Sequence, residues 1–243
     1  MRPGRLRHLA LALAGTCLLA GPPYLTDDPE PVDLHHWEVY LFATGQTFQG
    51  ARSGLAPAVE ANYGPFEDAQ LLVQVPLAYG DGADGLRHRG FGDLTVGFKY
   101  RFLHETGTAP QIALYPQIEA PTGSADDGLG GGHWRVLLPV WIQKSFGPWT
   151  TYGGAGWWRN PGLGNRNFTQ WGWLVQRALG EGYSLGAEIF HQGSPDLDTP
   201  ASTVWNLGFE CVLAPHFQLV GSGGRAFQGG RGSQFYLGIR GKT

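Results

Sequence analysis

Apolar and polar residues alternate along most of this chain, from about residue 34 to the C-terminus. In one such stretch Leu71, Val73, Val75 and Leu77 are interleaved with Gln70, Gln74 and Pro76. A period of two is typical of β-strands with one apolar face. The alternation predicts twelve strands, near residues 35–49, 54–63, 68–78, 91–103, 110–121, 133–146, 149–158, 168–180, 183–192, 203–214, 216–226 and 233–241.

The links between the predicted strands alternate in length and composition. One set is short and turn-like, and comprises 64–67, 104–109, 147–148, 180–182 and 215–216. The other set is mostly longer and rich in Gly and Asp, and comprises 79–90, 122–132, 159–167 and 193–202, with shorter members at 50–53 and 227–232. Short turns at one end and longer loops at the other are typical of outer-membrane barrels. We therefore predict an all-β fold, a transmembrane antiparallel β-barrel of about twelve strands over residues 35–243, with both termini periplasmic.

In six predicted strands one parity is plainly more apolar, and we expect it to face lipid. These positions are Trp37, Val39 and Leu41; Ile112, Leu114 and Ile118; Trp134, Val136, Leu138, Val140 and Ile142; Trp171, Trp173 and Val175; Trp205, Leu207, Phe209 and Leu213; Phe235, Leu237 and Ile239. Several of the aromatic residues lie near strand ends, where aromatic girdles of membrane barrels are found. The alternative is a large soluble β-barrel, in which the apolar face would point inward.

The N-terminus has the layout of a secretory signal peptide. Arg2, Arg5 and Arg7 precede an apolar run over residues 9–20, and Gly21 and two prolines end that run. The run is too short to cross a bilayer as a helix, so we expect a signal peptide over residues 1–21 that is cleaved near its end. Together with the strand pattern, this predicts the outer membrane of a Gram-negative bacterium as the location.

Composition excludes several classes of protein. The chain has 39 glycines and 9 tryptophans but no long apolar run after the signal, which excludes a helical membrane protein. A formal net charge of −3 gives no basic footprint, so we expect no nucleic-acid partner. Of the two cysteines, Cys17 lies in the signal and leaves Cys211 without a partner, which excludes a disulfide-stapled domain. Thr16 argues against lipidation of Cys17, since a small residue is expected there.

The opposite, polar parity predicts the residues that line the lumen. They are Glu38, Glu60, Lys99, Arg101, Glu119, Arg135, Gln143, Glu188, Glu210 and Arg240, with Gln46, Gln70, Gln74, Gln117, Gln176 and Asn206 among them. Because both signs of charge are present, no strong anion or cation filter follows. Two interpretations stay open: the charges pair with one another inside a narrow barrel, or they line a wet pathway and select the solutes that pass.

Residues 22–34, between the signal and the first strand, are rich in proline and acidic residues. Such a segment forms no regular element. It is either an extended periplasmic tail or a partial plug folded into the lumen. We favour the plug, because a free tail has little need of so defined a sequence.

Few residues suggest chemistry. The pair His35-His36 lies near Asp27 and Asp28 without the tight spacing of a metal site, so we predict a polar rim. His133 and His191, with scattered serines, would suit a lipid hydrolase embedded in the barrel, but no nucleophile motif is present. We expect Gly130-Gly131-Gly132 to be a flexible loop, and we predict no catalytic residue, metal or cofactor.

Several segments resemble the bacterial family named after the MetA pathway of phenol degradation. They are residues 22–31 with His36-Trp37-Glu38, Asn62-Tyr63-Gly64-Pro65, Pro121-Thr122-Gly123, residues 138–144, residues 147–154, and Glu188-Ile189-Phe190-His191-Gln192. The resemblance covers nearly the whole mature chain. It implies an outer-membrane channel that passively conducts small solutes, including aromatic or hydrophobic compounds, with outer-membrane lipid and the barrel-assembly machinery as partners. Alternatives are the embedded lipid hydrolase and a structural barrel that conducts nothing.

The chain departs from other outer-membrane barrels at its C-terminus. Such barrels commonly end on an aromatic residue used in assembly, whereas this chain ends on Gly241-Lys242-Thr243. Either Phe235 and Tyr236 serve instead, or assembly is less efficient.

Overall fold

The computed structural model describes residues 21–82 and 85–243, and every regular element in these ranges is a β-strand. The predicted signal peptide lies, apart from Gly21, outside the described residues. In the described ranges no helix is long and apolar enough to cross a membrane.

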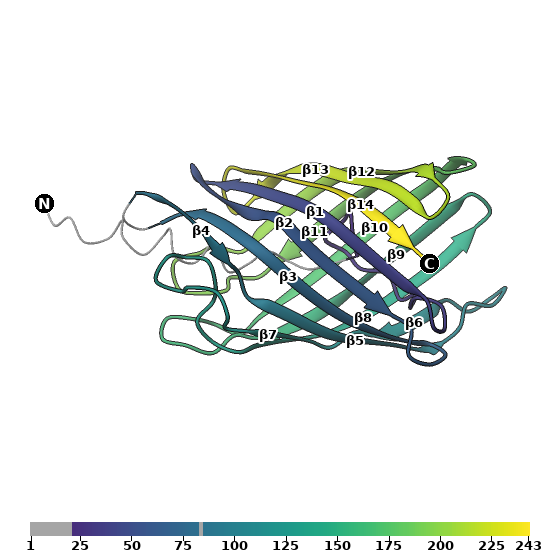
Figure 1. Cartoon of the computed structure of the whole chain (residues 1–243), viewed down its shortest axis with the longest axis horizontal. Coiled ribbons are helices and arrows are strands. Elements are labelled where there is room, and N and C mark those ends of the chain that lie inside the picture. Colours follow the sequence, from purple (N-terminus) through teal and green to yellow (C-terminus); the bar gives the residue numbers. More distant parts are fainter. Residues whose placement is uncertain (1–20, 83–84) are drawn as a thin grey trace, which may run out of the picture.

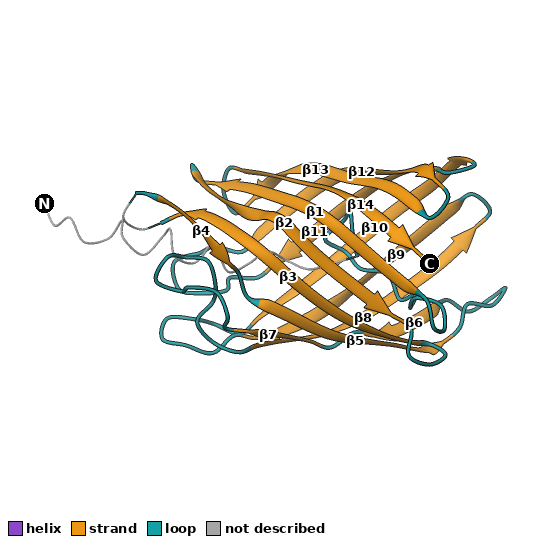
Figure 2. Cartoon of the chain, viewed as in Figure 1, coloured by secondary structure: helices purple, strands orange, loops and turns teal. Residues whose placement is uncertain are grey.

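The strands form one closed antiparallel sheet (Figures 1 and 2). Their bounds are β1 Trp37–Phe48, β2 Ala51–Tyr63, β3 Ala69–Asp81, β4 Arg87–Phe91, β5 Leu94–Leu103, β6 Gln111–Leu114, β7 Gln117–Ala120, β8 Arg135–Phe146, β9 Trp149–Arg159, β10 Phe168–Gly180, β11 Tyr183–Gln192, β12 Ser202–Ala214, β13 Phe217–Gln228 and β14 Gly232–Lys242. Neighbours in sequence are neighbours in the sheet, and β1 pairs with β14. Closure leaves no edge at this seam, which is what a barrel in lipid requires.

The predicted number of twelve barrel strands is confirmed, because two barrel strands are each divided into two pieces. The pieces β4 and β5 both pair with β3, and the break between them lies at Gly92-Asp93. The pieces β6 and β7 both pair with β5 and β8, and the break lies at Tyr115-Pro116, where the proline has no N–H to donate.

The prediction was wrong for these breaks and for one long loop. Residues 91–103 and 110–121 were each expected to form one unbroken strand. Residues 79–90 were expected to be a loop, but β3 extends to Asp81 and β4 begins at Arg87. Tyr79 pairs with Gly54 of β2 and with Arg89 of β4, and Asp81 pairs with Arg87, so this stretch is part of the ladder.

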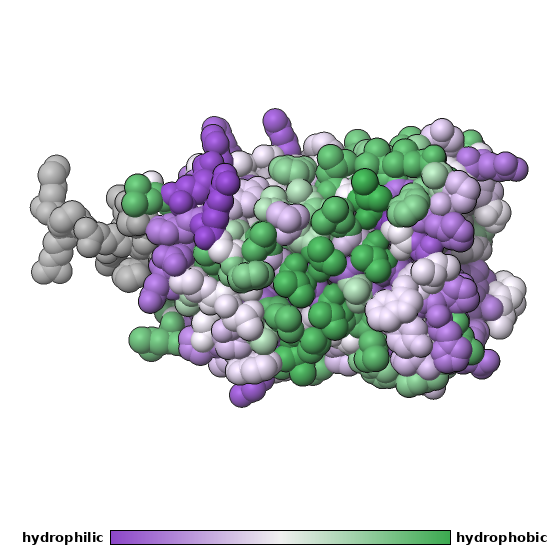
Figure 3. Space-filling view, viewed as in Figure 1, coloured by the Kyte–Doolittle hydropathy of each residue, from purple (hydrophilic) through white to green (hydrophobic). Residues whose placement is uncertain are grey.

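The predicted lipid-facing parity points outward. Leu138 is 51% exposed, Trp173 is 50% exposed and Leu237 is 50% exposed. Figure 3 shows apolar residues gathered around the middle of the barrel, with polar residues toward both ends. A soluble barrel would bury this face, so the soluble alternative is wrong.

Both the start of β1 and the end of β14 lie at one end of the barrel, which we call the terminal rim. Glu38 stands opposite Lys242 in the ladder, and the backbone N–H of Trp37 donates to Oγ1 of Thr243 at 2.9 Å. The links 64–68, 104–110, 147–148, 181–182 and 215–216 lie at this rim. The opposite end, which we call the distal rim, carries the longer links together with the short links 49–50 and 229–231. The periplasmic location of the termini remains a prediction.

The link over residues 121–134 at the distal rim folds into the barrel mouth and is not a free loop. Leu129 is only 4% exposed and packs in the inner apolar cluster. The Asp93 carboxylate accepts hydrogen bonds from the backbone N–H groups of Gly123 (3.0 Å) and Gly131 (2.6 Å). The break between β4 and β5 therefore supplies the residue that holds this link.

Candidate functional site

The nine charged residues predicted for the lumen, and Gln143 with them, lie on the inner side of the wall. Six of these ten are buried: Glu60, Lys99, Glu119, Arg135, Gln143 and Glu188. The other four are half-buried: Glu38, Arg101, Glu210 and Arg240. Several form ion pairs between strands: Glu119 with Arg135 and Glu38 with Lys242 (2.6 Å) on adjacent strands, and Glu210 with Arg240 (2.7 Å) across β13. Pairing compensates part of the cost of burying each ion.

Residues 21–34, which we call the luminal segment, lie inside the barrel. Near its start the segment is held by β11, because the Glu188 carboxylate accepts hydrogen bonds from the backbone N–H groups of Leu25 (3.2 Å) and Thr26. Nδ2 of Asn206 donates to the same carboxylate at 2.6 Å. Glu188 thus binds backbone, so no particular side chain of the segment is needed for this contact.

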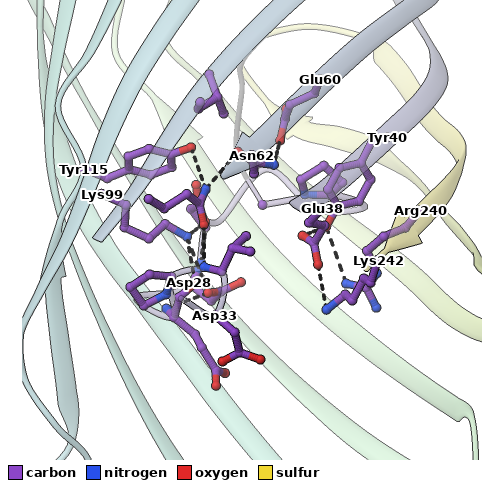
Figure 4. Close-up of a pocket in the computed structure, with 18 of the residues that line it drawn as sticks. Asp28, Asp33, Glu38, Tyr40, Glu60, Asn62, Lys99, Tyr115, Arg240 and Lys242 are labelled. Atoms are coloured by element: carbon purple, nitrogen blue, oxygen red, sulfur yellow. Dashed lines mark hydrogen bonds and ion pairs between the residues drawn. The ribbon is translucent and has the colours of Figure 1, made fainter. Parts of the chain in front are cut away.

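Further along, the luminal segment is held by charge. Nζ of Lys99 lies 3.0 Å from Oδ1 of Asp27 and 3.5 Å from Oδ1 of Asp28. Lys99 is only 3% exposed and lies 4.7 Å from the ring centroid of Tyr115. Figure 4 shows Lys99 and Tyr115 side by side, facing Asp28. The ammonium is therefore enclosed by the two carboxylates and one aromatic face.

The two contacts lie on nearly opposite walls. Between β5, which carries Lys99, and β11, which carries Glu188, the sheet has four barrel strands in one direction and six in the other. The backbone N–H of Val32 then donates to Oε1 of Gln70 on β3 at 3.0 Å. At the terminal rim Leu34 forms a bridge with Gly64. The luminal segment therefore crosses the lumen before it enters β1.

The luminal segment stands between two cavities. The larger, of about 420 Å³, opens toward the terminal rim, and the smaller, of about 70 Å³, lies toward the distal rim. Pro22 and Asp27 line the larger cavity, whereas Leu25 lines the smaller one. The charged residues around the larger cavity are Asp27, Asp28, Glu30, Asp33, Glu38, Glu60, Glu210, Lys99, Arg240 and Lys242. Carboxylates outnumber cations here, and the luminal segment supplies four of them.

The remaining predicted cation, Arg101, lies at the terminal rim. Its Nη2 is 2.7 Å from Oδ1 of Asp68, and Nε2 of His104 is 2.8 Å from Oδ2 of the same carboxylate. Partial burial alone would raise the pKa of Asp68, but Arg101 and His104 lower it below its ordinary value. Arg101 is thus occupied by a turn residue and does not face the larger cavity.

Two inner-wall residues near the luminal segment, Tyr115 and Asn62, were not among the predicted lumen residues. Tyr115 lies at the strand break but shares the parity of Gln117 and Glu119, and that shared parity was the available signal. Asn62 completes a buried chain of polar contacts, in which it donates to Glu60 at 2.8 Å and accepts from Gln70 at 2.9 Å. Its parity with Glu60 on the same strand was the available signal.

The histidines considered for chemistry have structural contacts. Nδ1 of His133 lies 3.1 Å from the carbonyl oxygen of Gly131, and Nδ1 of His191 lies 2.9 Å from Oγ1 of Thr203. Within residues 21–82 and 85–243, no group of three or more His, Cys, Asp or Glu residues is placed to hold a metal ion. At the polar rim the ring of His36 contacts the backbone, with its Nδ1 2.8 Å from the carbonyl oxygen of Leu34.

The family described as "Putative MetA-pathway of phenol degradation" matches residues 44–238 of this chain. No curated protein matches it. Among solved structures, the COG4313 outer membrane channel from Pseudomonas putida F1 is similar with a TM-score of 0.70 at 17% identity, over 89% of this chain and 98% of that chain. The KdgM porin in complex with disordered oligogalacturonate is similar with a TM-score of 0.59 at 8% identity, over 84% and 98% of the two chains. The NanC porin is similar with a TM-score of 0.56 at 8% identity, over 83% and 98%. At these identities the likeness establishes the outer-membrane barrel fold.

Proposed function

The chain belongs to the family named after the MetA pathway of phenol degradation, and from this premise we propose that it is a passive outer-membrane channel for small solutes. The luminal segment acts as a partial plug of this channel. One observation carries the proposal: the segment crosses the lumen between Lys99 and Glu188, and its residues line a cavity on either side of it.

The cargo we propose is small and aromatic or otherwise poorly polar. Support comes from the family's association with phenol degradation and from aromatic residues on the inner wall, such as Tyr40, Tyr115 and Tyr152, all less than 10% exposed. The paired charges between them form a polar lining that keeps the lumen wet. We propose no reaction, and the domain limits stay as predicted: signal 1–21, plug 22–34, barrel 35–243.

A second candidate is a structural barrel that conducts nothing. The same crossing of the lumen favours it, since a segment that never leaves would close the lumen permanently. The contacts of His133 and His191 give the lipid hydrolase no comparable support.

For membrane insertion we propose that the barrel-assembly machinery recognises the last strand through Phe235. Its ring is 50% exposed on the outer face, whereas the ring of Tyr236 points inward and stacks on Phe42 at 4.9 Å.

Deletion of residues 24–33 tests the channel proposal. We expect single-channel conductance in a planar bilayer to rise several-fold, because the ten residues removed include both contacts across the lumen. Heat-modifiable gel mobility of the deletion protein checks that the barrel is folded. A folded deletion protein with wild-type conductance would contradict the plug, and one with no conductance at all would favour the structural barrel.

A further inference from the structure

The inner wall has a flat region where the luminal segment begins. Gly186 on β11 and Gly208 on β12 stand directly opposite each other in the ladder, and both lie against the ring of Tyr24. Strand interiors rarely use glycine unless a backbone or ligand approaches closely. Two paired glycines on one face therefore indicate that something packs directly on the backbone here.

Distances show how close that packing is. A Cβ placed at Gly208 would lie 2.5 Å from Cε1 and 2.8 Å from Cζ of Tyr24, and one at Gly186 would lie 2.8 Å from Cζ. Both are nearer than real Cβ atoms approach other heavy atoms. Neither glycine has a positive φ. Space for a ring, and not backbone conformation, is thus the reason for glycine at both positions.

Other side chains complete a slot around the ring. Tyr24 is 3% exposed and clusters with Leu174, which is fully buried, and Tyr152, which is 6% exposed. The hydroxyl of Ser222 donates to the carbonyl of Pro23 and holds the backbone just before the ring. We call the site bounded by Gly186, Gly208, Leu174 and Tyr152 the ring slot. It has a flat backbone floor and apolar sides, which suits a planar six-membered ring.

The occupant of the ring slot is itself a phenol. Tyr24 presents a para-alkyl phenol, and the chain that carries it is attached to the lumen by a few contacts over residues 25–34. We propose that the ring slot is the recognition site for small planar aromatic solutes such as phenols, and that Tyr24 occupies it as an internal competitor. The inference rests on the proposed channel function, whose solute class and mode of opening it specifies.

Displacement follows from this competition. A solute that binds only where Tyr24 has left the slot shifts the equilibrium toward the state in which the start of the luminal segment is released. Its apparent affinity is reduced by the fraction of barrels in which the slot is free. A phenolic solute thus opens its own path, while non-aromatic solutes of the same size leave the segment in place.

The probe is p-cresol, which is the side chain of tyrosine as a free molecule. In the wild-type protein we expect p-cresol to raise single-channel conductance saturably. It should also raise hydrogen exchange of the Leu25 and Thr26 amides, because these donate to Glu188 only when the segment is docked. The matched control 4-methylcyclohexanol has similar size and one hydroxyl but no planar ring, and should have no comparable effect.

The variant Tyr24→Ala removes the competitor. We expect it to bind p-cresol at least about tenfold more tightly than the wild type, since a slot that is free in under a tenth of molecules lowers apparent affinity by that factor. The conductance response should also change sign, because p-cresol now fills an empty slot in place of displacing a chain segment.

The variant Gly208→Ala fills the floor of the slot and should abolish both responses. Its matched control is Gly223→Ala on β13, where the nearest atom to a Cβ is the carbonyl oxygen of Gln234 at 3.7 Å. Equal responses to p-cresol and 4-methylcyclohexanol, or equal p-cresol affinity of wild type and Tyr24→Ala, would overturn the proposal. So would an unchanged p-cresol response in folded Gly208→Ala. Deletion of residues 24–33 is read by conductance without any solute, so failure of the channel proposal is recorded separately.

Discussion

The two ends of the luminal segment are bound to opposite walls by different physics. At residues 23–26 the segment is held by shape and backbone hydrogen bonds, with Tyr24 on bare glycine backbone and two amides on Glu188. At residues 27–32 it is held by charge, with Asp27 and Asp28 on Lys99. A shape contact can be replaced by a solute of the same shape. A buried ion pair opposes release of the segment, because each charge would lose the partner that offsets its cost of burial.

This difference assigns separate roles to the two walls. The glycine wall of β11 and β12 determines what can compete with the segment, and the charged wall of β5 determines how long the rest of the segment stays when its start has left. Four experiments test whether the two walls act separately, and the first should give the strongest result.

Lys99→Met should have the largest effect. Removal of one partner of a buried pair costs about 3–5 kcal/mol, and the protein can avoid this cost by releasing Asp27 and Asp28 into water. We therefore expect conductance to approach that of the 24–33 deletion while the barrel stays folded. The variant Lys99→Met/Asp27→Asn removes both charges of the closer pair and should recover part of the wild-type closure. Wild-type conductance of Lys99→Met alone would show that charge does not hold the segment.

Glu188→Gln should have a smaller effect, confined to the glycine wall. A neutral amide keeps the size of the side chain but loses charge-assisted acceptance, and such hydrogen bonds are worth about 1.5–3 kcal/mol each. We expect faster exchange of the Leu25 and Thr26 amides and a lower concentration of p-cresol for half-maximal conductance. Asn206→Asp offers a contrasting variant, because it removes the amide that donates to Glu188 and places a second carboxylate beside it. If exchange at Val32 increased as much as at Leu25, the two contacts would not be separate.

Much of this architecture was predictable, because it depends on the two-residue period of apolar and polar side chains along each strand. Alternation gave the barrel, its twelve strands and the lipid face, since each side chain of a strand points to one of two environments. The break at Tyr115-Pro116 was not predictable from alternation, because the outward parity is the same on both sides of it. At Gly92-Asp93 the exposed positions change from odd numbers in β4 to even numbers in β5, and the single predicted strand over residues 91–103 began too late to include that change. The cause of each break is local, a proline without a donor in one case and an aspartate that binds the 121–134 link in the other.

The site was predictable only in part, for a geometric reason. Parity put Lys99 and Glu188 in the lumen, and the composition of residues 22–34 suggested a plug. That Lys99 binds Asp27 while Glu188 binds backbone depends on where the segment crosses, which no local pattern encodes. The glycines at 186 and 208 were unremarkable among 39 in the chain until their pairing across the ladder was known.

Charge on the luminal segment should also give the channel a modest ion preference. With seven carboxylates and three cations around the larger cavity, we expect cations to carry more of the current than anions. The variant with Asp28, Glu30 and Asp33 changed to Asn, Gln and Asn should lower the ratio of cation to anion permeability, measured from the reversal potential across a salt gradient. The mixed charges of the lumen predict no strong filter from sequence alone. An unchanged permeability ratio near one in both proteins would contradict the cation preference proposed here.

The smallest effect is expected at the terminal rim, away from both contacts. Because Arg101 and His104 lower the pKa of Asp68 below 3.8, this carboxylate stabilises the folded barrel at pH values above 3.8, and that stabilisation is lost as pH falls through the lowered pKa. Asp68→Asn should therefore reduce the free energy of unfolding by about 1 kcal/mol at pH 7 and by progressively less below pH 3.8. Urea titration of the wild-type and Asp68→Asn barrels in detergent, at pH 7 and below pH 3.8, measures this change in the free energy of unfolding. Conductance and p-cresol response should not change, because Asp68 touches neither wall contact of the luminal segment, and a change in either would mean that the rim is coupled to the plug.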